Sequence, residues 1–229
     1  MRKIGLLGGM SWESTALYYE LINREVRGRL GGLHSARCVL GSVDFHDIEA
    51  LQRSGDWEAA GSQLAEEARE LELAGAECLV LCTNTMHKVA GQIADAIEIP
   101  LLHLADVTAA AVREAGLEQV ALLGTRFTME ESFYRGRLAW GHVDAEVPDE
   151  ADRALVDRVI YDELVLGEVR DESRAEFVRI ISGMVEAGCQ GVILGCTEIE
   201  LLVGPDDVEV PVFPTTALHA RAAVDFALG

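Results

Sequence analysis

Two stretches of the chain share one pattern: Gly75-Ala-Glu-Cys-Leu-Val-Leu-Cys82-Thr83-Asn84-Thr85 and Gly188-Cys-Gln-Gly-Val-Ile-Leu-Gly-Cys196-Thr197-Glu198. Each is a short apolar run that is typical of a buried strand, and each ends in a cysteine followed by threonine. A single cysteine in such a place is most simply a small core residue. Two in matched positions indicate a symmetric site with a thiol on each side, which can take a proton from one face of a carbon and return one to the other.

A second pair of segments repeats in the same way. These segments are Ile4-Gly-Leu-Leu-Gly8-Gly-Met-Ser11 and Val120-Ala-Leu-Leu-Gly124-Thr-Arg-Phe-Thr128, and each passes from an apolar strand through glycine into a hydroxyl-bearing turn. Helical patterns follow at 13–29 and 129–139, and further helices at about 56–74 and 173–187 precede the cysteine strands. Strands that alternate with helices predict parallel sheets covered on both faces.

The sequence therefore predicts an α/β fold of two pseudo-symmetric domains, each a mainly parallel sheet flanked by helices. Ligands of such sheets bind at the carboxyl ends of the strands, so the active site is expected in the cleft between the two halves. We place the first half at residues 1–105 and the second at 106–211. The C-terminal helix, within 212–229, is expected to pack back on the first half.

Composition excludes several classes of partner. The net charge of −20 on 229 residues disfavours nucleic acid and anionic membranes, because both would be repelled. No stretch is long enough to span a membrane. Five cysteines, an odd number without a closely spaced framework, argue against a disulfide scaffold and favour reduced thiols in the cytoplasm.

Cys82 and Cys196 are the candidate catalytic residues. A strand that runs into a helix N-terminus aims backbone N–H groups and partial positive charge at the residues after the strand. This setting lowers the pKa of a thiol from about 8.5, so a thiolate is expected near neutral pH. Polar neighbours offer further hydrogen bonds to the same region: Thr83, Asn84, Thr85, Thr197 and Glu198. The other cysteines, at 38, 78 and 189, are expected in the core.

The glycine-rich turn Gly8-Gly9-Met10-Ser11 lacks the Gly-x-Gly-x-x-Gly spacing of a dinucleotide site. It is either a loop that lets the backbone approach a small ligand or a tight strand-to-helix turn without one. No metal is expected, because the six histidines never form a paired ligand spacing. His87, five residues after Cys82, either shapes the local field or lies on a helix surface. No cofactor is expected either, since the only lysines, Lys3 and Lys88, suit a pyridoxal phosphate Schiff base poorly.

Three segments carry a family resemblance: 5–14 (Gly-Leu-Leu-Gly-Gly-Met-Ser-Trp-Glu-Ser), 81–88 (Leu-Cys-Thr-Asn-Thr-Met-His-Lys) and 195–200 (Gly-Cys-Thr-Glu-Ile-Glu). They resemble the aspartate/glutamate/hydantoin racemase superfamily, in particular its cofactor-independent, broad-specificity amino-acid racemases and aspartate racemases. The resemblance runs nearly end to end. It implies an isomerase that acts on a small amino acid and is often a homodimer, with Cys82 and Cys196 as the acid/base pair. It also implies a substrate site at Met10, Gln52, Thr83, Asn84, Thr85, Thr125, Thr197 and Glu198.

One departure from the family pattern concerns the substrate's side chain. Relatives that use aspartate carry basic residues where this chain has Ile48 and Val165. A second carboxylate buried without a cation is costly, so neutral amino acids are expected to be favoured. Two alternatives remain open: a maleate isomerase or malonate decarboxylase type of enzyme from the same superfamily, and a two-lobed ligand-binding module without turnover.

Overall fold

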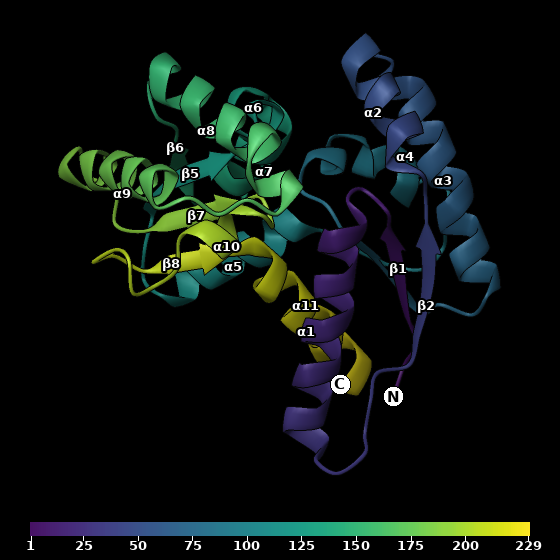
Figure 1. Cartoon of the computed structure of the whole chain (residues 1–229). Helices are drawn as coiled ribbons and strands as arrows, with labels where there is room; N and C mark the ends of the chain where they lie inside the picture. The colour runs from purple at the N-terminus through teal and green to yellow at the C-terminus, as the bar shows by residue number, and fades with distance from the viewer. The chain divides into compact units, whose positions relative to one another are not determined.

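The strands of the chain form two parallel four-stranded sheets with the same internal order. The computed structural model describes all residues, Met1–Gly229. The first sheet has the order β2-β1-β3-β4 and the second has the order β6-β5-β7-β8. The chain divides into two compact units, Met1–Leu104 with His219–Gly229, and Ala105–Leu218. Each sheet belongs to one of these units (Figure 1).

The first unit is built from alternating strands and helices. Its strands are β1 (Ile4–Gly8), β2 (Cys38–Ser42), β3 (Cys78–Leu81) and β4 (Leu101–Leu102). Its helices are α1 (Trp12–Leu30), α2 (Phe45–Ser54), α3 (Trp57–Leu73), the 3₁₀ helix η1 (Thr85–Val89) and α4 (Ala90–Ala94), joined by most of α11 (Thr215–Leu228). Because each crossover between neighbouring parallel strands contains a helix, both faces of the sheet are covered.

Side chains alternate between the two faces of the first sheet, as the pleat of a strand requires. Cys78, Val80 and Cys82 pack on the face that α1 and α11 cover, whereas Leu79 and Leu81 pack on the face of α3. Figure 1 shows α1 and α11 side by side along this unit. The thiol of Cys82 therefore belongs to the side of the sheet where α1 and α11 lie.

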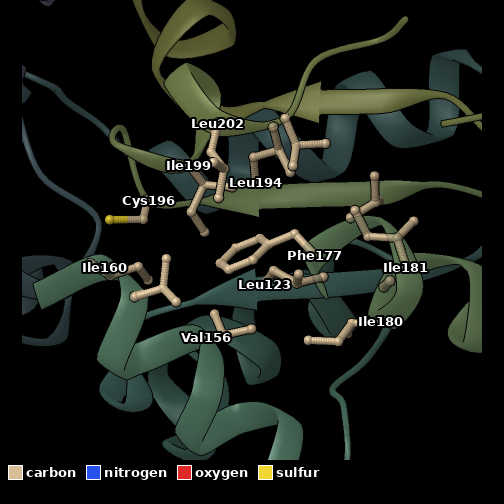
Figure 2. Packing of buried hydrophobic residues seen from close by; sticks show 14 of the residues in the cluster. Leu123, Val156, Ile160, Phe177, Ile180, Ile181, Leu194, Cys196, Ile199 and Leu202 are labelled. Carbon is tan, nitrogen blue, oxygen red and sulfur yellow. The ribbon is translucent and has the colours of Figure 1, made fainter. Parts of the chain in front are cut away.

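The second unit repeats this construction. Its strands are β5 (Gln119–Gly124), β6 (Asp144–Glu146), β7 (Val192–Gly195) and β8 (Val212–Pro214). Its helices are α5 (Leu104–Glu114), α6 (Arg126–Glu130), α7 (Ser132–Trp140), α8 (Glu150–Asp162), η2 (Leu164–Leu166), α9 (Asp171–Glu186) and α10 (Ile199–Leu202). Leu123 and Leu194 of the strands pack with Val156 of α8 and Phe177 of α9 (Figure 2). The two units thus share strand order, crossover helices and a core on the sheet face.

The helix boundaries predicted from the sequence agree with the structure except at 129–139. The expected helices 13–29, 56–74 and 173–187 correspond to α1, α3 and α9, with ends that differ by one or two residues. The pattern at 129–139 is not one helix, because Glu131 is extended (φ −90°, ψ 151°) and separates α6 from α7. Within residues 212–229, Val212–Pro214 form the short strand β8, which pairs with β7, and the C-terminal helix α11 begins at Thr215. No helix is both long and apolar enough to cross a membrane.

The turn after β1 requires glycine for reasons within the chain itself. A Cβ at Gly8 would lie 2.3 Å from Thr15 Cγ2, and one at Gly9 would lie 2.2 Å from the carbonyl oxygen of Val43. Gly9 also has φ +93°, where residues with a side chain are strained. Its N–H donates to Thr15 Oγ1 at 2.9 Å. The two glycines are therefore explained by the tight passage from β1 into α1.

Replacing Gly9 by alanine should destabilise the protein by about 1–3 kcal/mol, the usual cost of a strained backbone position, with the steric contact added. The measurement is chemical unfolding followed by circular dichroism. Gly28→Ala is the matched control, because Gly28 lies within α1 with no atom close to its added Cβ. That control should be neutral or stabilising by up to about 1 kcal/mol. Equal effects of the two substitutions would contradict this explanation of the turn.

Candidate active site

The cysteines follow directly after the central strands of the two sheets. In the first unit β1 and β3 pair with Leu7 opposite Leu81, so the turn after β1 lies beside Cys82. In the second unit Gly124 pairs with Gly195, which sets Thr125 beside Cys196. The carboxyl ends of parallel strands meet at one edge of a sheet. Each unit therefore presents one thiol at the edge where α/β proteins bind their ligands.

Three bonds from three different elements hold the backbone around Cys82. The N–H of Cys82 donates to the carbonyl oxygen of Leu7 in β1 at 2.9 Å. The carbonyl oxygen of Cys82 accepts from the hydroxyl of Ser14 in α1 at 3.4 Å. The next carbonyl, that of Thr83, lies 2.7 Å from Nδ1 of His87 in η1. The thiol itself is fully buried, so its position follows from this fixed backbone.

The remaining predicted residues of the first unit are all buried. Thr83, Asn84 and Thr85 follow Cys82 and lead into η1. Met10 belongs to the core cluster that also holds Met86. Gln52 reaches this cluster from α2, where its Nε2 donates to Sδ of Met86 at 2.8 Å. Thr83, Asn84 and Thr85 thus adjoin Cys82 in the chain, whereas Met10 and Gln52 pack with Met86 on the α3 face of the sheet.

Ile48 was expected to form a wall that meets the substrate's side chain. It is completely buried in the core cluster of the first unit, which also holds Met10. The reason is its place on α2, whose buried residues are Ile48 and Gln52. Val165, the other expected wall residue, is partly buried against the core of the second unit. An arginine at position 48 would have to enter a packed apolar cluster, which is costly for an unpaired charge.

The second unit places a carboxylate directly against its cysteine. The thiol of Cys196 donates to Oε2 of Glu198 at 2.9 Å. In Figure 2 the sulfur of Cys196 points away from the packed side chains of Phe177 and Ile199, at the margin of the core. Glu198, predicted from the sequence to lie near the substrate, is thus a hydrogen-bond acceptor for the thiol in this structure. Such a pair can move a proton between sulfur and oxygen.

Threonines and a second carboxylate surround this pair. The hydroxyl of Thr216 donates to that of Thr197 at 3.1 Å, and the N–H of Thr216 donates to Oε1 of Glu200 at 3.0 Å. Thr125 is the N-cap of α6, and its Oγ1 accepts from the N–H of Thr128 at 3.4 Å. Glu200 was not among the predicted site residues. Burial and the nearby Glu198 raise the pKa of Glu200 to about 7, although its bonds to Thr216 act in the opposite direction.

The expected lowering of the thiol pKa values is wrong for this structure. Burial raises the pKa of Cys82 far above its ordinary value. Burial also raises the pKa of Cys196, and the negative charge of Glu198 raises it further. The helix argument fails because short helices follow both cysteines: the 3₁₀ helix η1 after Cys82 and the four-residue α10 after Cys196. Both cysteines are therefore thiols at neutral pH in the protein without substrate.

Three buried histidines form a cluster behind Cys82 that the sequence did not reveal. The ring of His87 lies 4.7 Å from that of His103 and 5.8 Å from that of His219, measured between centroids. His219 is held by the hydroxyl of Tyr18 at 2.9 Å and by the carbonyl oxygen of Leu102 at 2.7 Å. No group of three or more histidine, cysteine or acidic side chains is arranged to hold a metal ion. One signal was available: His87 and His103 follow the paired strands β3 and β4, so both come to the same edge.

Comparisons with known proteins identify the class. The model of the Asp/Glu/hydantoin racemase family matches residues 7–223. The fold is similar to that of a candidate Asp/Glu racemase from Yersinia pestis, with 53% identity, TM-score 0.95 and full coverage of both chains. It is also similar to an aspartate racemase homologue from Pyrococcus horikoshii, with 31% identity, TM-score 0.88 and full coverage of both. An aspartate racemase from Picrophilus torridus shares the fold at 19% identity and TM-score 0.78, with coverage of 99% of this chain and 94% of that one.

Two α/β units with one strand order, each ending its central strand at a cysteine, match the two-domain racemase fold. The chain belongs to the Asp/Glu/hydantoin racemase family. The fold class and the family predicted from the sequence are confirmed, and membership supports an isomerase whose substrate is a small amino acid.

The contact between Cys196 and Glu198 gives a testable difference between the two thiols. Glu198→Gln removes the charge that raises the pKa of Cys196, so more of this cysteine becomes thiolate and reacts with iodoacetamide at pH 7–8. Site-resolved mass spectrometry measures the rate. Cys82, whose raised pKa has no contribution from Glu198, is the internal control and should react at its wild-type rate. An unchanged rate at Cys196 would show that Glu198 does not control its ionisation.

Proposed function

We propose that the protein is an amino-acid racemase without a cofactor, in which Cys82 and Cys196 each act on one face of the substrate's Cα. The observation that carries the proposal is the matched placement of the two cysteines, each directly after the central strand of a sheet with the same order. A racemase must remove a proton from one face and deliver one to the other. Two thiols of opposite protonation state suit that task, because each can serve as acid or base.

The proton balance of the proposed reaction is simple. One cysteine, as thiolate, takes the Cα proton and becomes a thiol, while the electron pair stays on the substrate as a carbanion. The other cysteine, as thiol, gives its proton to the opposite face and becomes a thiolate. The reverse reaction begins from this exchanged state. Each direction therefore needs one ionised and one protonated cysteine at its start.

Glu198 supplies a way to ionise one of the two. As a carboxylate, Glu198 opposes ionisation of Cys196, but once it accepts the thiol proton along the 2.9 Å contact it is a neutral acid and its charge no longer does so. That transfer leaves Cys196 as a thiolate for the Cα proton. Cys82, whose thiol has only a long contact of 3.7 Å to the carbonyl oxygen of Val80, begins as the acid in that direction. The carbanion needs stabilisation, and hydroxyl, amide and backbone donors in the two cysteine loops are suited to hold the substrate's carboxylate. The donors of the cysteine loops are Thr83, Asn84, Thr85 and Thr197, and Thr125, after β5, lies beside the second loop.

Replacing either cysteine should abolish inversion of the substrate's configuration but keep exchange of its Cα proton with solvent. Cys82→Ala and Cys196→Ala should each lower racemisation by at least about 10³-fold, within the range seen when a nucleophile or base is removed. In D₂O each variant should still exchange the Cα proton of the one enantiomer that its remaining thiol can reach. With a panel of L- and D-amino acids, circular dichroism measures racemisation and NMR measures exchange of the Cα proton. Cys38→Ala, a substitution away from the sheet edge, is the control that should keep activity.

Full racemisation by Cys196→Ala would overturn the two-thiol proposal. If the wild-type protein neither racemises any amino acid of the panel nor incorporates solvent deuterium at its Cα, a different reaction of the same superfamily would be favoured. Binding that survives both substitutions without any turnover would favour a binding module.

We further propose that neutral amino acids are the better substrates. Support comes from the basic residues next to the predicted site, which are engaged elsewhere. Arg53 Nε donates to Glu49 at 2.9 Å, and Arg126 Nε donates to Glu130 at 2.9 Å. The ammonium of Lys88 lies 3.8 Å from the ring centroid of Trp57. A second substrate carboxylate would have to displace one of these contacts, whereas a neutral side chain would not.

Initial rates on the amino-acid panel test this preference. Neutral amino acids should be racemised faster than aspartate and glutamate, and Lys88→Met should leave the ratio of the two rates unchanged. The description of the Yersinia pestis relative points the other way, toward acidic substrates. Aspartate turnover about tenfold above that of every neutral amino acid, a difference of about 1.4 kcal/mol in the barrier, would decide for acidic substrates.

A further inference from the structure

The imidazole of His87 bridges two backbone groups from different segments. Its Nδ1 lies 2.7 Å from the carbonyl oxygen of Thr83, and the N–H of Leu104 donates to its Nε2 at 3.2 Å. A carbonyl oxygen can only accept, so Nδ1 carries the hydrogen. An amide N–H can only donate, so Nε2 has a free lone pair. The two contacts together require one neutral tautomer of His87.

The surroundings of His87 keep it neutral. Its ring is buried and packs against His103 and His219. Burial lowers the pKa of His87 well below its usual value, and the two neighbouring histidines lower it further. His219 is itself held neutral: Nε2 lies by the carbonyl oxygen of Leu102, Nδ1 lies by the hydroxyl of Tyr18, and burial lowers its pKa to about 4. His87 is therefore a fixed hydrogen-bonding group rather than a proton carrier.

The contact with Thr83 completes the fixation of the Cys82 backbone. Leu7 and Ser14 hold the N–H and the carbonyl of Cys82 itself. The bond from His87 holds the carbonyl oxygen of the following peptide, between Thr83 and Asn84. A trans peptide points its N–H and its C=O in opposite directions, so the bond from His87 also sets the direction of the Asn84 N–H. The side chain of His87 therefore helps to fix the direction of the backbone directly after Cys82.

We propose that His87 is a positioning residue for Cys82, which holds the thiol and the loop after it in the geometry that proton transfer needs. This inference rests on the proposed function, because it assumes that Cys82 is one of the two acid/base groups. A displacement of about 1 Å can lower the rate of a positioned reaction by about 10²-fold. His87 acts through the Thr83 carbonyl and does not touch the reacting atoms.

The experiment compares three substitutions in the full chain. His87→Asn presents an amide nitrogen close to the position of Nδ1 and keeps a donor for Thr83. His87→Gln carries its amide farther out, toward Leu104, and His87→Ala loses both bonds. We expect racemisation to fall by roughly 10- to 100-fold in the Gln and Ala variants and to recover in the Asn variant. In D₂O the Gln and Ala variants should exchange the Cα proton more slowly in the enantiomer that Cys82 deprotonates. The exchange rate of the other enantiomer should stay as in wild type.

The pattern of exchange separates positioning from mere stability. Tyr18→Phe removes the hydroxyl bound to His219 without touching His87, so it should leave the ratio of the two exchange rates as in wild type. Equal losses in all three His87 variants, or equal losses for both enantiomers, would overturn the inference. If the Ala variant does not fold, the comparison of Asn with Gln decides. If Cys82→Ala keeps full racemisation, the proposed function is wrong. If Cys82→Ala loses racemisation but the three His87 variants are equally active, only the proposed role of His87 is wrong.

Discussion

The parallel pairing of β1 with β3, and of β5 with β7, is the constraint on which both cysteines depend. Because parallel strands end at one edge, this pairing brings the loop after β1 to Cys82 and Thr125 to Cys196. In the first unit it also supplies the bond from the N–H of Cys82 to Leu7. Helices on both faces then bury the strands, which keeps water away from the thiols and raises their pKa values.

Much of the fold could be predicted from the sequence because it repeats a local pattern. Apolar strands that end in glycine or cysteine, each with a helix on either side, specify parallel units without knowledge of tertiary contacts. The error lies in the second half, where the pattern predicts one helix at 129–139 and the structure has two, α6 and α7. Glu131 interrupts a continuous helical pattern through its backbone angles alone.

The site was less predictable, because its properties arise from burial and from contacts distant in sequence. The sequence predicted both cysteines and Glu198, but not the contact between Cys196 and Glu198 that opposes ionisation of the thiol. Ile48 was expected to meet the substrate, and its burial depends on how α2 lies against the sheet. The sequence left open whether His87 shapes the local field or lies on a helix surface; its bonds run to Thr83 and to Leu104, which lies 17 residues farther along the chain.

The central claim is that two different groups handle the proton that leaves and the proton that arrives. The most direct measurement is a single turnover of an α-deuterated amino acid in ordinary water, with the inverted product analysed by mass spectrometry. The two-thiol mechanism predicts an inverted product with protium at Cα. The deuterium stays on the first cysteine, and the second cysteine supplies its own proton. A product that retains the substrate's deuterium would show that one group performs both transfers, and it would contradict the account.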